Sequence, residues 1–299
     1  MDIKKLDVFC KVVELKSFTK AAEAAQLSQP TVSEHLRNLE EELGVKLVDR
    51  LGREVEPTPV GRLLYSHAVR LLRLQQETLQ AVAHFNGALS GEVRIGASTI
   101  PGTYILPGLL GSFRRLHPAV KPLVHISDSR ATAARVIDGT FDLGLVGAIW
   151  NERSLEWTAL FSDTLVVAVH PRHPLAGRPS LAIDQLGSHP FILREPGSGT
   201  RKILARILEQ HGYKETDLDE VAVLGSNEAI KEAVKADLGI SVLSARSIAE
   251  DVEGGKLAAV SLEQVATERP ICLIQRKNRE PSPVAAVLID FLRARAEAV

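Results

Sequence analysis

The sequence predicts an α/β chain of 299 residues in three parts, and three features of the sequence support this prediction. Two short helical patterns separated by a tight turn occupy residues 17–43. A heptad stripe of apolar residues runs from residue 64 to residue 89, and strand patterns alternate with helical patterns after residue 91. We therefore expect three domains, at residues 1–58, 59–90 and 91–299.

The first part begins with an amphipathic helix over residues 3–15, which should pack beneath the two short helices. Ser17 or Thr19 can cap the first short helix. Ser28 can cap the second, with Pro30 in its first turn, where a missing N–H costs nothing. The second helix should bury four apolar residues that recur at helical spacing: Val32, Leu36, Leu39 and Leu43.

The opposite face of this second helix is polar near its N-terminus, and Gly44 supplies a left-handed cap at its end. Short hydrogen-bonding side chains at a helix N-terminus suit the floor of a DNA major groove. The face carries Gln29, Thr31, Ser33, Glu34 and Arg37. The alternative is a plain helical hairpin with a solvated polar face.

Residues 45–57 predict a two-stranded β-hairpin, with Arg53 at its tip. Residues 1–58 hold nine Lys and Arg against eleven Asp and Glu, so this part is not basic overall. DNA binding would then depend on local arrangement. We expect Arg37, Lys46, Arg50 and Arg53 to face phosphates, and Glu40, Glu41 and Glu42 to point away.

Thr58 and Pro59 predict the start of a helix that continues to about residue 89. Its apolar seam alternates spacings of four and three, which is typical of a helix that pairs with a second copy of itself. The seam comprises Leu64, Ala68, Leu71, Gln75, Thr78, Val82, Phe85 and Leu89. The alternative is a helix that docks on its own domain. Residues 87–91 are small and predict a hinge.

After residue 91 the pattern predicts a parallel sheet covered by helices on both faces. Strands are expected in the segments GEVRIGAS, 120–126, FDLGLVGA, LVVAVH, PFILRE, EVAVLG, GISVLS and RPICLIQ. Helices are expected over residues 107–116, 129–138, 200–211, 227–236 and 283–298.

The segments AAEAAQLSQPTVS, LEEELGVKLVDR and PTPVG resemble the LysR-type transcriptional regulators, and the resemblance covers the whole chain. It implies an N-terminal winged helix-turn-helix, a long linker helix through which two chains dimerise, and a two-lobed effector domain like a periplasmic binding protein. Lobe I would span about residues 91–162 and 266–299, and lobe II about residues 163–265. The expected partners are double-stranded DNA, a small effector, and further copies of the chain in a homodimer or homotetramer.

The exposed helix face and the resemblance together predict the DNA-binding residues: Ser28, Gln29, Pro30, Thr31, Ser33, Arg37, Arg50 and Arg53. Glu34 departs from the family pattern, in which a basic or neutral residue is commoner. A carboxylate there either accepts a hydrogen bond from a cytosine amino group or only repels phosphate.

Three loops that follow strands and precede helices carry small hydroxyl and amide side chains. Such loops bind ligands in open α/β sheets, and hydroxyls with free amides at helix N-termini suit an anion. The resemblance implies that these loops line the cleft between the lobes, as the matching loops do in the family. The effector-binding candidates are Ser98, Thr99, Thr103, Gly197, Ser198, Thr200, Ser226 and Asn227. The alternative for each loop is simple helix capping.

The GSGTR run, Gly197 to Arg201, is similar to regulators of sulfur assimilation, and the whole chain is similar to a subgroup associated with selenium metabolism. We therefore expect a small anion between the lobes, either a sulfur or selenium oxyanion or a short carboxylate. The near absence of aromatic residues around the loops argues against a ring-shaped ligand.

Other functions are disfavoured by the motifs. No zinc-ligand spacing of histidines, nucleophile elbow or phosphate-binding P-loop occurs, so we expect no enzyme activity, metal or cofactor. Cys10 and Cys272 lie in apolar stretches and should be core residues of a reducing compartment. MDIKKLDVF has no signal-peptide pattern and no membrane-spanning run occurs, which indicates a cytoplasmic protein. The alternative is a solute-binding or transport receptor, against which the first 90 residues argue.

Overall fold

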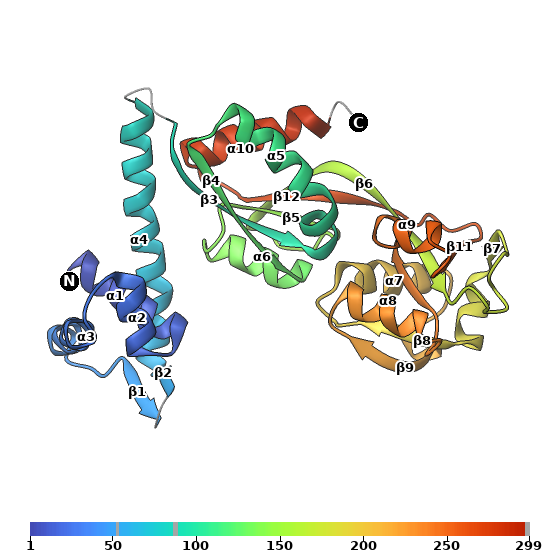
Figure 1. The fold of residues 1–299 in the computed structure, drawn as a ribbon, viewed down its shortest axis with the longest axis horizontal. Helices are drawn as coiled ribbons and strands as arrows, with labels where there is room; N and C mark the ends of the chain where they lie inside the picture. The colour runs from blue at the N-terminus through green and yellow to red at the C-terminus, as the bar shows by residue number, and fades with distance from the viewer. Residues whose placement is uncertain (52–53, 86–88, 297–299) are drawn as a thin grey trace. The chain divides into compact units, whose positions relative to one another are not determined.

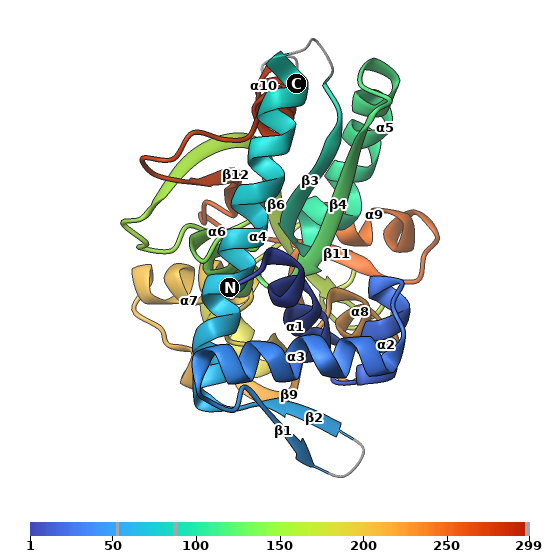
Figure 2. The ribbon, with the colours of Figure 1, turned by 90° about the vertical axis from the view of Figure 1, so that its left-hand side faces the viewer.

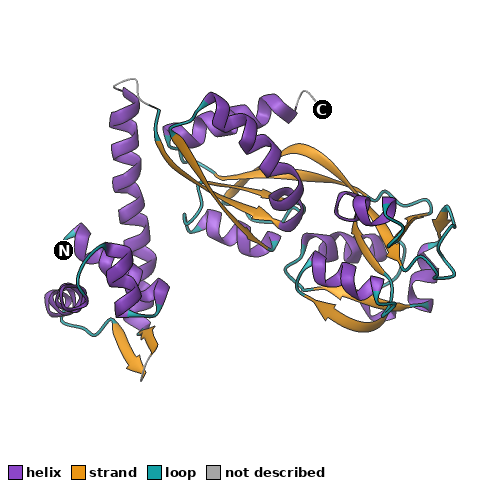
Figure 3. Cartoon of the chain, viewed as in Figure 1, coloured by secondary structure: helices purple, strands orange, loops and turns teal. Residues whose placement is uncertain are grey.

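The computed structural model describes residues 1–51, 54–85 and 89–296 (Figure 1). The chain divides into two compact units, Met1–Ala88 and Leu89–Val299. The first unit is mostly helical, whereas the second alternates strands and helices (Figure 3). Among the described residues, no helix is long and apolar enough to cross a membrane.

Three helices form the core of the first unit: α1 (Ile3–Leu15), α2 (Phe18–Ala25) and α3 (Gln29–Leu43). The predicted caps are confirmed, because the Ser17 hydroxyl accepts from the Lys20 N–H and the Ser28 hydroxyl accepts from the Thr31 N–H. Gly44 closes α3 with a φ of 67°. Buried apolar residues from all three helices, among them Leu6, Phe9, Ala21 and Leu39, make one cluster with the base of the hairpin.

The predicted hairpin is present and consists of β1 (Val48–Leu51) and β2 (Glu54–Pro57), which pair antiparallel (Figure 2). Helix α4 follows at Pro59–Phe85, starting where the proline predicted. The predicted end near residue 89 is wrong, because Leu89 is not helical and packs against the core of lobe I instead of the seam. The tip of the hairpin and the predicted hinge both fall partly outside the described residues.

The predicted seam residues of α4 do not all share one environment: the first ones pack inside their own unit, and later ones are exposed. Ala68 is 0% exposed and packs with the core of its own unit, and Leu64 packs against the same core. The prediction is therefore wrong for the first turns, because α4 docks on α1 there. Beyond this region α4 leaves a row of large apolar side chains exposed: Leu71, Leu74, Leu79 and Val82.

Lobe I of the second unit is a sheet between helices (Figure 1). Its strands are β3 (Gly91–Ser98), β4 (Val120–Ser127) and β5 (Leu143–Val146), and β3 lies parallel to both of the others. Helices α5 (Leu106–Leu116) and α10 (Pro283–Ala296) cover one face, and α6 (Ser129–Ile137) covers the other. A short π-helix, η1 (Pro101–Ile105), joins β3 to α5.

Lobe II is built around the parallel pair β8 (Pro190–Arg194) and β9 (Asp219–Leu224) together with three further short strands. These are β7 (Ser180–Leu181), β10 (Ser241–Ser244) and β11 (Ala258–Leu262). Its α-helices are α7 (Gly199–Gln210), α8 (Asn227–Lys235) and α9 (Ala245–Glu253), and its 3-10 helices are η2 (Ile183–Ser188) and η3 (Glu215–Asp217). The apolar patterns of the sequence did not predict α9, β7 or β11.

Two long strands, β6 (Leu155–Val169) and β12 (Glu268–Arg276), connect the lobes and pair antiparallel (Figure 1). Strand β12 is also antiparallel to β5, and β6 is antiparallel to β10 and β11. The predicted all-parallel sheet is therefore wrong at the crossing. The two crossing strands set Asp163 directly opposite Arg269.

Candidate functional site

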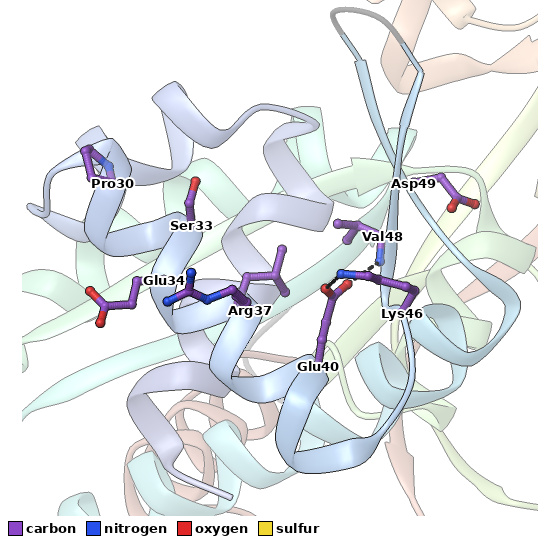
Figure 4. Close-up of a pocket in the computed structure, with 9 residues that line it drawn as sticks. Pro30, Ser33, Glu34, Arg37, Glu40, Lys46, Val48 and Asp49 are labelled. Atoms are coloured by element: carbon purple, nitrogen blue, oxygen red, sulfur yellow. Dashed lines mark hydrogen bonds and ion pairs between the residues drawn. The ribbon is translucent and has the colours of Figure 1, made fainter.

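An open groove in the first unit lies between α3 and β1 (Figure 4). Its α3 side carries Pro30 together with Ser33, Glu34 and Arg37, which belong to the face predicted to be polar. Its other side carries Lys46, Val48 and Asp49. The groove is thus bordered by a helix N-terminal half and by one strand of the hairpin.

The polar residues at the start of α3 bond to one another. The Ser28 and Thr31 hydroxyl oxygens lie 2.8 Å apart, and the Gln29 amide donates to the Ser33 hydroxyl at 3.1 Å. These bonds hold the side chains in a defined arrangement on the helix surface. Pro30 is exposed within the first turn of α3.

Arg37 is exposed and its Nε lies 3.6 Å from a carboxylate oxygen of Glu41, one turn along the same helix. The Arg50 backbone belongs to β1, but its side chain lies outside the described residues. Arg53 also lies outside them.

Glu40 differs from its prediction. The expectation was that Glu40 points away and Leu43 is buried, but Glu40 is 8% exposed and Leu43 is 39% exposed. The Glu40 carboxylate accepts from the Leu47 N–H at 2.8 Å and from the Lys46 ammonium at 2.6 Å. These bonds turn Glu40 toward the hairpin and join α3 to the base of β1 (Figure 4).

A second pocket, in the Leu89–Val299 unit, lies between the lobes; it is narrow and open to solvent, with a volume of about 20 Å³. Lobe I contributes the end of β3 and the start of α6, whereas lobe II contributes the end of β8 and the start of α7. Crossing strand β12 supplies Arg269. The full lining is Ser98, Thr99, Ile100, Asp128, Ser129, Arg194, Ser198, Gly199, Thr200 and Arg269.

The hydroxyls on the lobe I side are well buried. The Ser98 hydroxyl accepts from the Gly147 N–H at 3.2 Å, which anchors the loop after β3. Ser129, the first residue of α6, is 1% exposed, and its hydroxyl has no hydrogen-bond partner among the residues that the structure describes. A buried hydroxyl without a partner is costly, so this group is available to a bound molecule.

The lobe II side presents the N-terminus of α7. Ser198 caps the helix by accepting from the Arg201 N–H, and the buried Thr200 hydroxyl accepts from Arg269 at 3.2 Å. A Cβ placed on Gly199 would lie 2.7 Å from the Ser129 hydroxyl oxygen, so a side chain there would fill the space between the lobes.

Two buried guanidinium groups complete the pocket. Arg269 donates to the carboxylate of Asp163 at 2.9 and 2.8 Å. Burial lowers the pKa of Arg269, and the neighbouring Asp163 opposes that shift. Arg194 is paired with Glu195 at 2.7 Å and donates to the Asn227 side-chain oxygen.

Four of the predicted effector residues lie elsewhere. Thr103 is exposed within η1, and Ser226 is an exposed cap that accepts from the Ala229 N–H at the start of α8. Asn227 is buried behind Arg194, and Gly197 packs against Asp128, whose Cγ would lie 2.6 Å from an added Cβ. The structure thus brings together Ser98, Thr99, Ser198 and Thr200.

Sequence reasoning missed Asp128, Ser129, Arg194 and Arg269 as pocket residues. Asp128 and Ser129 had the same signal as the chosen loops, because they follow a strand and begin a helix. Arg194 ends an apolar strand, which is an unusual place for a charge. No local pattern around Arg269 predicts that it lines a pocket.

Two family descriptions match the chain. "Bacterial regulatory helix-turn-helix protein, lysR family" matches residues 3–62, and "LysR substrate binding domain" matches residues 86–297. The chain belongs to the LysR family of transcriptional regulators. It is therefore a DNA-binding regulator with an effector-binding domain, and the α3 groove and the inter-lobe pocket lie in the two matched segments.

Relatives support this assignment over nearly the full length. The HTH-type transcriptional regulator CysL of Bacillus subtilis is 32% identical over 289 residues, covering 97% of this chain and 96% of the relative. The regulatory domain of Synechocystis PCC6803 CcmR, solved in complex with 2-PG, is 27% identical with a TM-score of 0.64, covering 70% of this chain and 98% of that one. Full-length CbnR complexed with its target DNA shares the fold, with a TM-score of 0.73 at 21% identity over 99% of this chain and 100% of that one.

Proposed function

We propose that this LysR-type regulator responds to a small anion held in the inter-lobe pocket. The observation that carries the proposal is the buried, unpartnered hydroxyl of Ser129 at the start of α6, facing the start of α7 across the Gly199 backbone. Helix N-termini present free N–H groups and partial positive charge, which favour anions.

The two cations of the lining are already paired, so an anion in the pocket would be held by neutral hydrogen-bond donors. Arg194 and Arg269 are buried cations, and each already holds a carboxylate partner outside the lining. Asp128 is a carboxylate within the lining, but it serves as the α6 cap and accepts from the Ala131 N–H at 2.7 Å. The ligand is therefore a sulfur or selenium oxyanion or a short carboxylate that accepts from hydroxyls and backbone amides. The solved complex of the CcmR regulatory domain with 2-PG shows that a relative of this domain binds a small molecule.

The polar start of α3 is the proposed base-reading surface. Gln29, Pro30, Thr31 and Ser33 would meet base edges or nearby phosphates, with Ser28 and Arg37 contacting the backbone. Arg50 and Arg53 of the wing are proposed phosphate or minor-groove contacts. Glu34 lines the same groove, where a carboxylate would favour a cytosine amino group over a phosphate.

The exposed apolar row of α4 supports a homodimer through this helix, and pairing of two dimers would give a tetramer. Large exposed apolar side chains in a row mark an interaction surface. A solute-binding receptor, the rival function, would need neither this row nor the α3 groove. Domain boundaries at residues 58/59 and 90/91 are part of the proposal, with α4 as the linker.

Calorimetric titration of the full-length chain with sulfate, selenate and acetate at constant ionic strength tests the proposal. We expect at least one of these anions to bind, and Ser129→Ala to weaken it by about tenfold, as loss of a charge-assisted hydrogen bond predicts. Ser226→Ala is the matched control, because it removes a capping hydroxyl outside the pocket. Binding of only neutral or aromatic ligands, or equal effects of the two variants, would refute the site.

A further inference from the structure

Two positive side chains lie over the ring of Trp150, outside the residues that line the inter-lobe pocket. The Lys202 ammonium, in the first turn of α7, lies 3.6 Å from the centroid of the Trp150 ring. The Arg130 guanidinium carbon, in the first turn of α6, lies 5.8 Å from the same centroid. One cation thus comes from each lobe, and the indole stands in contact with both.

This group is not neutralised by carboxylates. Within the part of the chain that the structure describes, Lys202, Arg130 and Arg206 have no ion-pair partner. Partial burial lowers the pKa of Lys202, and the charges of Arg130 and Arg206 lower it further. Mutual repulsion of this kind is relieved by a bound negative group.

Trp150 supplies an unused donor. Its indole Nε1 is buried and has no hydrogen-bond partner among the described residues. Indole nitrogen is a donor only, and a buried donor without an acceptor is costly. The two cations and this N–H therefore offer the features of an anion subsite, charge and a hydrogen-bond donor, around one side chain.

The group lies next in sequence to residues that line or adjoin the pocket of the proposed function, although it does not itself line that pocket. Arg130 follows Ser129, Lys202 lies two residues after Thr200, and Trp150 lies two residues after Ala148. Ser129, Ala148 and Gly199, which precede the three residues in sequence, lie close together. A Cβ added to Gly199 would lie 2.7 Å from the Ser129 hydroxyl oxygen and 3.2 Å from the Ala148 Cβ.

We propose that the effector carries two negatively charged groups joined by a short linker, with the second group held by Lys202 and Arg130 beside Trp150. The first group occupies the pocket at Ser129 and Thr200, so this inference rests on the proposed function and narrows its ligand class. A free inorganic oxyanion fills only the first position. The class that fits is a short dianion, such as a phosphono-carboxylate, phospho-carboxylate or dicarboxylate.

Calorimetric titration of the full-length chain at constant ionic strength with matched probes tests this inference. The single-group probes are methyl phosphate and acetate. The two-group probes are phosphonoacetate, 3-phosphonopropionate and 4-phosphonobutyrate, which differ only in linker length. We expect at least one two-group probe to bind about tenfold or more tightly than either single-group probe, since it gains a second set of charge-assisted hydrogen bonds.

Variants locate the second group. Lys202→Gln and Arg130→Gln should each remove most of the extra affinity of the two-group probes while leaving methyl phosphate affinity unchanged. If one variant does not fold, the other alone is sufficient for the test. Lys256→Gln, which removes an exposed cation elsewhere in the same unit, is the control for net charge and should change nothing.

The possible failures are distinguishable. If methyl phosphate or acetate binds and no two-group probe binds more tightly, the second subsite is refuted and the proposed function stands. Equal weakening of all probes by Lys202→Gln, or no effect of it on a tight two-group probe, also refutes the subsite. If no probe of either kind binds, both the subsite and the anion proposal are refuted.

Discussion

Glu40→Ala should loosen the wing and thereby weaken DNA binding, although Glu40 itself is not among the proposed DNA contacts. The Glu40 carboxylate is the acceptor for the buried Leu47 N–H at 2.8 Å, so its removal leaves that donor unpaired. An unsatisfied buried donor costs about 1–3 kcal/mol. The ion pair to Lys46 adds little, because the lysine side chain is 76% exposed. The expected local loss is therefore about 1–3 kcal/mol, set by the N–H.

Hydrogen exchange, measured by mass spectrometry on peptides that contain Leu47 and Val48, measures this loss of local stability directly. The protection of these amides from exchange depends on the free energy of local opening. Protection should fall by roughly tenfold or more in Glu40→Ala, and operator affinity should fall with it. Glu40→Gln keeps an acceptor oxygen and should retain most of both. Glu41→Ala is the matched control, since Glu41 is exposed and pairs only with Arg37 in the described ion pairs. Unchanged protection in Glu40→Ala would show that this carboxylate does not hold the wing.

Three further results are expected. Leu79→Glu, which charges a side chain that is 64% exposed on α4, should convert dimers to monomers in sedimentation, whereas Val221→Glu, which charges an exposed side chain of β9 in the second unit, should not; a dimeric Leu79→Glu chain would contradict the α4 interface. Asp163→Ala should lower the free energy of unfolding by about 3–5 kcal/mol in urea titration, because it leaves the Arg269 guanidinium buried and unpaired; a loss below about 1 kcal/mol would contradict this. Burial, then the charge of Glu14, raises the pKa of Cys10 to about 12, so at pH 8 the native thiol should resist thiol reagents until the chain unfolds.

Local signals in the sequence were sufficient for the boundaries of α2 and α3. Ser17, Ser28 and Gly44 act through bonds within a few residues, so their types alone predict where helices begin and end. Glu40 was misassigned because its partner is the N–H of Leu47, beyond the end of the helix. Helical periodicity carries no information about such a contact, and it favoured Leu43 for the buried position.

The inter-lobe pocket was predictable where a loop joins a strand to a helix, and unpredictable where distant strands cross. Ser98 and Thr200 follow that local rule. Arg269 reaches the pocket because β12 pairs antiparallel with β6, which sets it opposite Asp163 at a separation of 106 residues. The alternation of strands and helices predicted parallel pairing there, since periodicity does not distinguish strand direction.

A crystal structure of the full-length protein grown with selenate tests the central claim most directly, because selenium gives an anomalous signal that locates the anion. We predict a single strong anomalous peak in the second unit, within hydrogen-bond distance of the Ser129 and Thr200 hydroxyls and the first N–H groups of α7. A strong peak elsewhere, or an empty pocket at a selenate concentration that saturates calorimetric binding, would contradict the account.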